Sequence, residues 1–141
     1  MKVAFVCAGN AGRSQLATAF AERERDERGL DVEVVTGGTD PAESVHDEIR
    51  EVLEERGLDV GDRTPRAITS DDVEDAEYVV TMGCSIEGIR PPDWQGEIRR
   101  WELEHPSAGD LESARRQRDE IEGRVPQLFG DLEEADETRS P

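Results

Sequence analysis

The sequence of 141 residues contains only two cysteines, Cys7 and Cys84. Two thiols are too few for a disulfide-rich scaffold, and they lack the spacing of metal ligands. No apolar run approaches the ~20 residues that cross a bilayer, and no leader with a charged start and an apolar centre opens the chain. We therefore expect a cytoplasmic protein that contacts no membrane and carries no metal or other cofactor.

Basic residues are also scarce. The chain has 17 Lys and Arg against 35 Asp and Glu, a net charge of −18, and Lys2 is the single lysine. Such a surface repels nucleic acid and anionic membranes, so we expect no nucleic-acid partner. It also repels itself at low salt, which favours a halophilic protein in a concentrated-salt cytoplasm. The alternative is an acidic surface with no environmental meaning.

Hydrophobic residues make up only 34% of the chain, and charged residues make up 37%. The apolar residues nevertheless fall in compact runs, which predicts a folded core beneath a very polar surface. The length suits one domain. We expect this domain over residues 1–132 and an acidic, disordered tail over residues 133–141. The oligomeric state stays open.

The stretch over residues 3–14 organises the rest of the chain, because it places a cysteine between a strand and a helix. Residues 2–6 form an apolar run typical of a buried parallel strand, and a helical pattern begins at Ser14. Between them lies a loop of small residues that begins with Cys7. The N–H groups of such a loop, a helix start and the guanidinium of Arg13 can together bind a tetrahedral oxyanion and favour the thiolate form of the cysteine.

The remaining pattern predicts an α/β fold. We expect further strands over residues 32–36, 78–82 and 98–101, and helices over residues 14–28, 44–56, 68–73 and 111–132. Residues 37–41, Gly-Gly-Thr-Asp-Pro, are expected to break the second strand after Thr36, and Pro126 is expected to kink or divide the last helix. In such a fold the loop after the first strand lies at the carboxyl edge of the sheet, where open α/β sheets bind ligands.

Three other features of the sequence lie outside this loop. Cys84 follows the strand at 78–82, so we expect it at the same edge as Cys7, although a buried structural thiol is the alternative. His46, at the start of the second helix, is expected to cap or pack there rather than to catalyse. Residues 63–66, Arg-Thr-Pro-Arg, form a basic island in an acidic chain.

In this context the pattern Cys7-x5-Arg13-Ser14 resembles the phosphate loop of the low-molecular-weight protein tyrosine phosphatase superfamily, which includes the thioredoxin-linked arsenate reductases. The resemblance covers residues 1–132. It implies a single three-layer α/β domain with a four-stranded parallel sheet flanked by helices, and a phosphate loop after the first strand.

Several features look more like the reductase branch of that superfamily. Gln15 stands where phosphatases usually have proline, and residues 79–84 resemble the reductase segment that carries the second redox cysteine. Residues 101–103, Trp-Glu-Leu, and residues 118–125 are similar to the same branch.

The resemblance implies a role for each residue of the loop. Cys7 is the nucleophile, Ser14 hydrogen-bonds its thiolate, and Asn10 holds the shape of the loop. The oxyanion-binding residues implied in this way are Ala8, Gly9, Asn10, Ala11, Gly12 and Arg13.

Two related reactions fit this loop. In an arsenate reductase, Cys7 attacks arsenic(V), Cys84 then attacks Cys7, and arsenite leaves as a Cys7–Cys84 disulfide forms. In a phosphatase acting on phosphoesters or phosphotyrosine, Cys7 takes the phosphoryl group and water removes it. The ligand is an arsenate- or phosphate-type oxyanion in both cases.

Two departures from the family pattern bear on this choice. Gly88 stands about where thioredoxin-linked reductases have a third cysteine, so a thioredoxin- or glutaredoxin-like protein or a small thiol would have to reduce the disulfide directly. His105, beside Glu104, stands where the family has its general-acid aspartate, and histidine can donate a proton near neutral pH. Phosphoester cleavage loses about 10²–10⁴ in rate without such an acid, whereas arsenate depends on it less. We therefore favour a reductase over a phosphatase, and a non-enzymatic oxyanion-binding or redox-sensing module is the third hypothesis.

Overall fold

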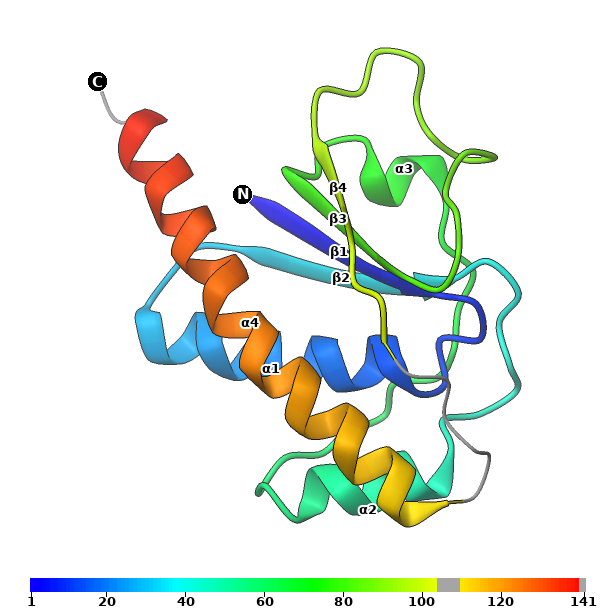
Figure 1. Ribbon diagram of the computed structural model, residues 1–141. Coiled ribbons are helices and arrows are strands. Elements are labelled where there is room, and N and C mark those ends of the chain that lie inside the picture. The colour runs from blue at the N-terminus through cyan, green and yellow to red at the C-terminus, as the bar shows by residue number, and fades with distance from the viewer. Residues whose placement is uncertain (104–109, 140–141) are drawn as a thin grey trace.

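The computed structural model describes residues 1–103 and 110–139, so the expected acid His105 and its neighbour Glu104 lie outside the described residues. The chain folds into one α/β domain around a four-stranded parallel sheet of strand order β2-β1-β3-β4 (Figure 1). The strands are β1 (Lys2–Cys7), β2 (Glu33–Gly38), β3 (Tyr78–Met82) and β4 (Glu97–Arg100). The predicted fold class is confirmed.

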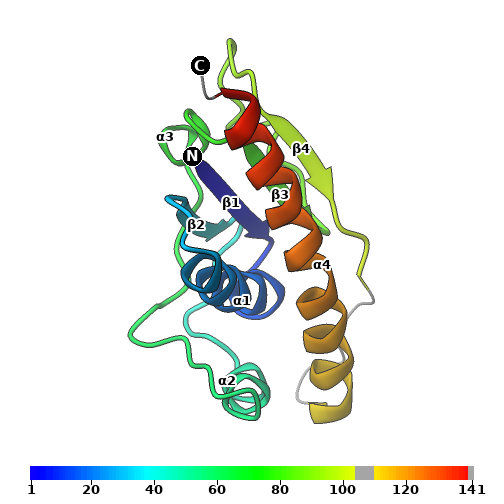
Figure 2. The same cartoon turned by 90° about the vertical axis from the view of Figure 1, so that its left-hand side faces the viewer.

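Helices cover both faces of this sheet. They are α1 (Arg13–Arg28), α2 (Asp47–Glu54), α3 (Ser70–Val73) and α4 (Leu111–Arg139). α1, α2 and α4 lie on one face, and the short α3 lies on the other (Figures 1 and 2). None of the helices in the described part of the chain is long and apolar enough to cross a membrane.

The first strand contributes to both hydrophobic cores because its side chains alternate between the two faces of the sheet. Val3 and Phe5 are buried in the large core with residues of α1 and α4. Ala4 and Val6 are buried in the smaller core, together with Val73 of α3. Burial on both faces explains why the run over residues 2–6 is continuously apolar.

The helix α1 begins directly after the loop that follows β1. Its first half, from Ser14 to Ala21, is buried against the sheet and α4. It ends, as predicted, at Gly29, whose φ of 64° is in the left-handed region that glycine adopts without strain. The packing of this helix fixes the position of the loop in front of it.

The second strand ends within residues 37–41 but two residues later than predicted, because Gly37 and Gly38 still belong to β2 and Gly38 pairs with Cys7. A Cβ at Gly37 would lie 2.9 Å from the backbone of Ile68, and one at Gly38 would overlap the carbonyl oxygen of Ala8. Glycine here allows close packing of the chain rather than a turn. The two residues bring β2 against the base of the loop that contains Ala8.

The last helix is longer than expected. α4 is continuous from Leu111 to Arg139, so Pro126 does not divide it, and residues 133–139 are helical rather than a disordered tail. Arg28 of α1 donates to the Pro126 carbonyl oxygen at 3.2 Å and pairs with Glu133 at 3.0 Å, which holds this part of the helix to α1. The buried side chains recur at helical spacing on both sides of the proline: Ile121, Val125, Leu128, Phe129 and Leu132.

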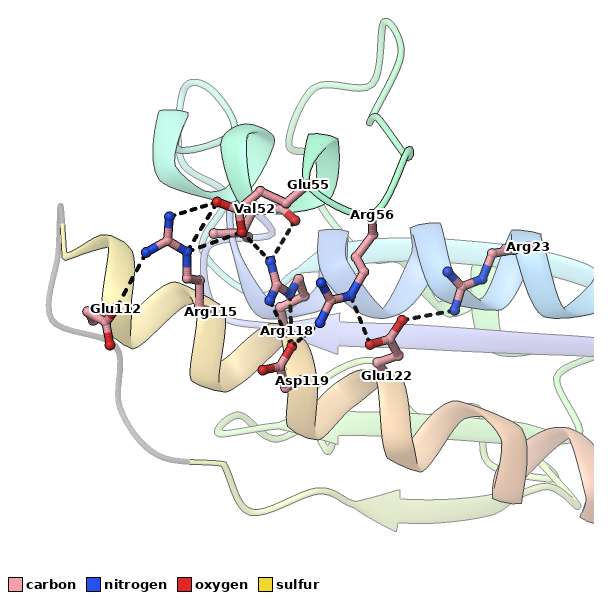
Figure 3. A network of polar contacts seen from close by, with 9 residues as sticks. All are labelled: Arg23, Val52, Glu55, Arg56, Glu112, Arg115, Arg118, Asp119 and Glu122. Carbon is pink, nitrogen blue, oxygen red and sulfur yellow. Dashed lines mark hydrogen bonds and ion pairs between the residues drawn. The ribbon is translucent and has the colours of Figure 1, made fainter.

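A polar network joins α4 to α2 beside the large core (Figure 3). The buried Arg118 donates to the Val52 carbonyl oxygen at 3.1 Å and forms ion pairs with Glu55 and Asp119. Hydrogen bonds from Arg115 and Arg118 lower the pKa of Glu55 to about 2. The network continues to α1 through Arg56, Glu122 and Arg23.

Candidate active site

The carboxyl ends of β1 and β3 form the edge of the sheet where the candidate residues meet. Cys7, the last residue of β1, lies between Gly38 of β2 and Met82 of β3 in the strand register. The chain leaves β1 toward β2 on one side and reaches β3 on the other, so β1 and β3 flank the point where the strand order reverses. Parallel α/β sheets bind ligands at such a point.

The loop over residues 7–12 turns its carbonyl groups away from the site. The carbonyl oxygens of Cys7, Ala8, Gly9 and Ala11 accept hydrogen bonds from backbone N–H groups in the segment over residues 39–46, at 2.8 to 3.3 Å. Within the described parts of the chain, no acceptor receives the backbone N–H groups of residues 9–12. A loop with bound carbonyls and free N–H groups is suited to an anion.

The thiol of Cys7 lies against the first turn of α1. Its Sγ is 3.0 Å from Ser14 Oγ, and both residues are buried. Asn10 Nδ2 donates to Ser14 Oγ at 2.7 Å. The Ser14 oxygen thus accepts from Asn10, and its own O–H is free to donate to Cys7, which stabilises a thiolate.

Asn10 is held from several directions. Its φ of 52° is the one positive φ among the described residues other than glycine. Its Nδ2 also donates to Thr36 Oγ1 at 2.9 Å, and its Oδ1 accepts from the backbone N–H of Arg66 at 3.1 Å. Gln15 Nε2 donates to the Asn10 carbonyl oxygen at 3.0 Å. These contacts hold the loop in its shape.

The basic island over residues 63–66, to which sequence reasoning gave no role, contacts residues that hold this loop in place. Arg63 Nε donates to Gln15 Oε1 at 2.8 Å, and Arg63 also pairs with Glu22 of α1. Arg66 Nη1 donates to the Thr36 carbonyl oxygen at 2.8 Å. The signal in the sequence was the island itself, but its partners are distant in the chain and only the fold brings them together.

Arg13 extends from the start of α1 toward the end of β3. A Cβ on Gly83 would lie 2.7 Å from Arg13 Nη1, so the guanidinium rests directly over this glycine. Gly83 has a φ of 81°, which a residue with a side chain rarely adopts. Glycine at this position therefore serves both the turn after β3 and the placement of Arg13.

Cys84 lies beside Arg13, at the same edge as Cys7. Its Sγ donates to the carbonyl oxygen of Val6, the residue before Cys7, at 3.5 Å. Burial raises the pKa of the Cys84 thiol, and the nearby Cys7 acts in the same direction. Arg13 and Cys84 line a cavity of about 460 Å³. Both cysteines are free thiols in this structure.

His46 lies next to the loop over residues 7–12, directly before α2. It is the N-cap residue of α2, and its backbone N–H donates to the Ala11 carbonyl oxygen at 3.1 Å. His46 occupies the N-cap position without a capping hydrogen bond from its side chain, so a capping role for the imidazole is not confirmed. Among the described residues, no group of three His, Cys, Asp or Glu side chains could hold a metal ion.

A family model described as low molecular weight phosphotyrosine protein phosphatase matches residues 2–138. The chain belongs to this family. The resemblance seen in the loop that follows β1 is thereby confirmed, and the family match covers nearly all of the chain.

Relatives within this family carry arsenate reductase names. A Halobacterium salinarum protein provisionally named an arsenate reductase is 47% identical over 133 residues, which cover 93% of this chain and 92% of that protein. The glutaredoxin arsenate reductase of Synechocystis sp. is 31% identical over 134 residues, which cover 93% of this chain and 98% of that protein. The solved structure of a Corynebacterium glutamicum thioredoxin-dependent arsenate reductase matches with a TM-score of 0.78 at 32% identity. That match covers 95% of this chain and 62% of the longer Corynebacterium chain.

Proposed function

We propose that this protein reduces arsenate to arsenite, with Cys7 as the nucleophile and Cys84 as the resolving thiol. One observation carries the proposal: the Cys84 thiol contacts the residue before Cys7 and lines a cavity with Arg13. A phosphatase has no need of a second thiol at this place. The arsenate reductase names of the relatives support the same conclusion.

In the first step, arsenate binds to the free N–H groups of the loop and to Arg13. The Cys7 thiolate attacks arsenic(V), and one arsenate oxygen leaves as water after protonation. His105 is the proposed proton donor, as the sequence suggested. The buried hydroxyl of Ser14 holds the thiolate toward the loop, which favours attack from a fixed geometry.

In the second step, the Cys84 thiol loses its proton and attacks Cys7 Sγ. A sulfur–sulfur bond forms, the sulfur–arsenic bond breaks, and its electron pair goes to arsenic, which leaves as arsenite. Two thiols are oxidised to one disulfide and arsenic(V) is reduced to arsenic(III), so the electrons balance. An external thiol then restores the two cysteines.

The test is arsenite release by the parent protein, Cys7→Ser and Cys84→Ser with dithiothreitol as reductant. We expect Cys7→Ser to abolish release and Cys84→Ser to stop turnover after the arsenic adduct has formed on Cys7. Normal turnover by Cys84→Ser would overturn the two-cysteine scheme. Hydrolysis of an aryl phosphate that requires Cys7 but not Cys84, without arsenite release, would make the protein a phosphatase instead.

A further inference from the structure

The cavity beside Cys84 contains a second cationic side chain for which the proposed function gives no role. Besides Arg13 and Cys84, its lining includes Thr81, Arg100 and Glu102. A smaller hollow of about 210 Å³ shares Thr81, Cys84 and Arg100 with it. Arg100 therefore stands where two hollows meet at the Cys84 thiol.

Arg100 differs from its neighbour on the same strand. Arg99 is paired with Glu97 and Asp131 and lies over the ring of Tyr78. The exposed guanidinium of Arg100 has no hydrogen bond or ion pair with any residue of 1–103 or 110–139. In a chain with 35 acidic and 17 basic residues, an unpaired arginine at the opening of a cavity is available to an anion from outside.

We propose that Arg100 binds the carboxylate of a small thiol that reduces the Cys7–Cys84 disulfide, an inference that rests on the proposed function. The chemical class is a cysteine-containing amino acid or short peptide with a free carboxylate. Glu102, on the same cavity, suits the ammonium group that such a thiol also carries. A guanidinium and a carboxylate that line one cavity match the two charges of an amino-acid group.

The accessibility of the two sulfurs determines which one the reductant attacks. Cys7 is 3% exposed, whereas Cys84 is half-buried and lines the cavity. The thiolate of the small thiol therefore attacks Cys84 Sγ, and the disulfide breaks so that its electron pair leaves with Cys7. The hydroxyl of Ser14 stabilises this leaving thiolate, which speeds the exchange. A second molecule of the small thiol then attacks the mixed disulfide, which releases the Cys84 thiol and an oxidised dimer of the reductant.

Two observations favour a small thiol over a protein reductant. The chain has no third cysteine that could carry the disulfide to the surface, because Cys7 and Cys84 are its only two. The accessible sulfur lies in a hollow of about 460 Å³, a volume within the range of small-molecule sites. A protein dithiol would have to insert its own cysteine into this hollow.

The experiment measures the rate at which a Cys7–Cys84 disulfide is reduced in the full chain. Oxidation with diamide prepares the disulfide, so the measurement does not depend on arsenate. The reductants are glutathione, which is anionic, neutral 2-mercaptoethanol and cationic cysteamine, each normalised to its rate with a small unstructured disulfide. The parent is compared with Arg100→Gln, Arg100→Lys and the control Arg25→Gln. Arg25 makes an ion pair near the far end of α1, ~18 Å along the helix from Arg13.

We expect the parent to react fastest with glutathione after normalisation. Arg100→Gln should lower that rate about three- to tenfold while 2-mercaptoethanol changes less than about twofold, as for one partly exposed guanidinium–carboxylate contact. Arg100→Lys should restore part of the loss, and Arg25→Gln should match the parent.

Equal loss with all three thiols, or no preference of the parent for glutathione, would overturn the proposal. So would faster reduction by a thioredoxin that is unaffected by Arg100→Gln. If arsenate does not oxidise the parent while the diamide-made disulfide shows the expected preference, the proposed function fails and the thiol site stands.

Discussion

The substitution Gly83→Ala tests the role of Arg13 in anion binding. A control substitution at a second glycine shows how much stability is lost without any displacement of Arg13. Gly83 has a φ of 81°, and its new Cβ would meet Arg13 Nη1 at 2.7 Å. The overlap is with the end of a flexible side chain, so the guanidinium moves rather than the backbone. Gly57→Ala is a matched control, because Gly57 has a φ of 73° and no atom within 4 Å of its added Cβ.

Both substitutions place a side chain in the left-handed region, which costs about 1–2 kcal/mol in the free energy of unfolding. Only Gly83→Ala displaces the group that we propose grips the oxyanion. A hydrogen bond to a charged group contributes about 1.5–3 kcal/mol, so the dissociation constant for phosphate should rise roughly ten- to hundredfold in Gly83→Ala. In Gly57→Ala it should stay within about twofold of the parent.

The assays are urea unfolding and calorimetric titration with inorganic phosphate, at one salt concentration for all three proteins. Similar losses of stability with unequal losses of phosphate affinity are the expected result. If Gly83→Ala binds phosphate as tightly as Gly57→Ala, Arg13 does not hold the oxyanion from its position over Gly83, and the geometric argument is refuted.

Three further predictions follow from hydrogen bonds and pKa shifts. Ser14→Ala removes the O–H group beside Cys7 Sγ. A lost hydrogen bond of about 1 kcal/mol should make the alkylation of Cys7 by iodoacetamide at pH 7 roughly fivefold slower. An unchanged rate would show that Ser14 does not stabilise the thiolate. Because its ion pairs lower the pKa of Glu55 from 4.5 to about 2, the stability that they contribute is complete above pH 4.5 and is lost as the pH falls toward 2. Urea unfolding at pH 5.5 and 3.5 should therefore show a smaller acid loss in Glu55→Gln than in the parent, and equal losses would contradict the assignment. Burial raises the pKa of the Cys84 thiol, so the rate of single-turnover arsenite release should still rise with pH above the usual pKa of a free thiol. A rate that stays constant between pH 7 and 10 would show that deprotonation of Cys84 does not limit that step.

Short-range patterns predicted the parts of the fold that depend on neighbouring residues. The apolar run before Cys7, the small-residue loop and the helix that starts beside Ser14 each depend on one continuous segment. Gly29 ended its helix as predicted because a left-handed C′ residue is a local requirement. The placement of Cys84 followed from one further rule, that parallel strands share their carboxyl edge.

The features that sequence reasoning missed depend on contacts between distant segments. Gly37 looked like a breaker because the proximity of Ile68 is not visible in the sequence. Arg63 supports Gln15 across 48 positions, and no local pattern indicates that pairing. Residues 133–139 looked like a tail because they are mostly acidic and polar. They are helical because they continue α4, which packs along α1, and this packing is not visible in the sequence.

The most direct test of the account is mass mapping of the parent protein after exposure to arsenate without a reductant. The account predicts a peptide pair joined by a Cys7–Cys84 disulfide, formed in proportion to the arsenite released and absent when phosphate replaces arsenate. Arsenite release with both cysteines still reduced, or the same disulfide with phosphate, would contradict it.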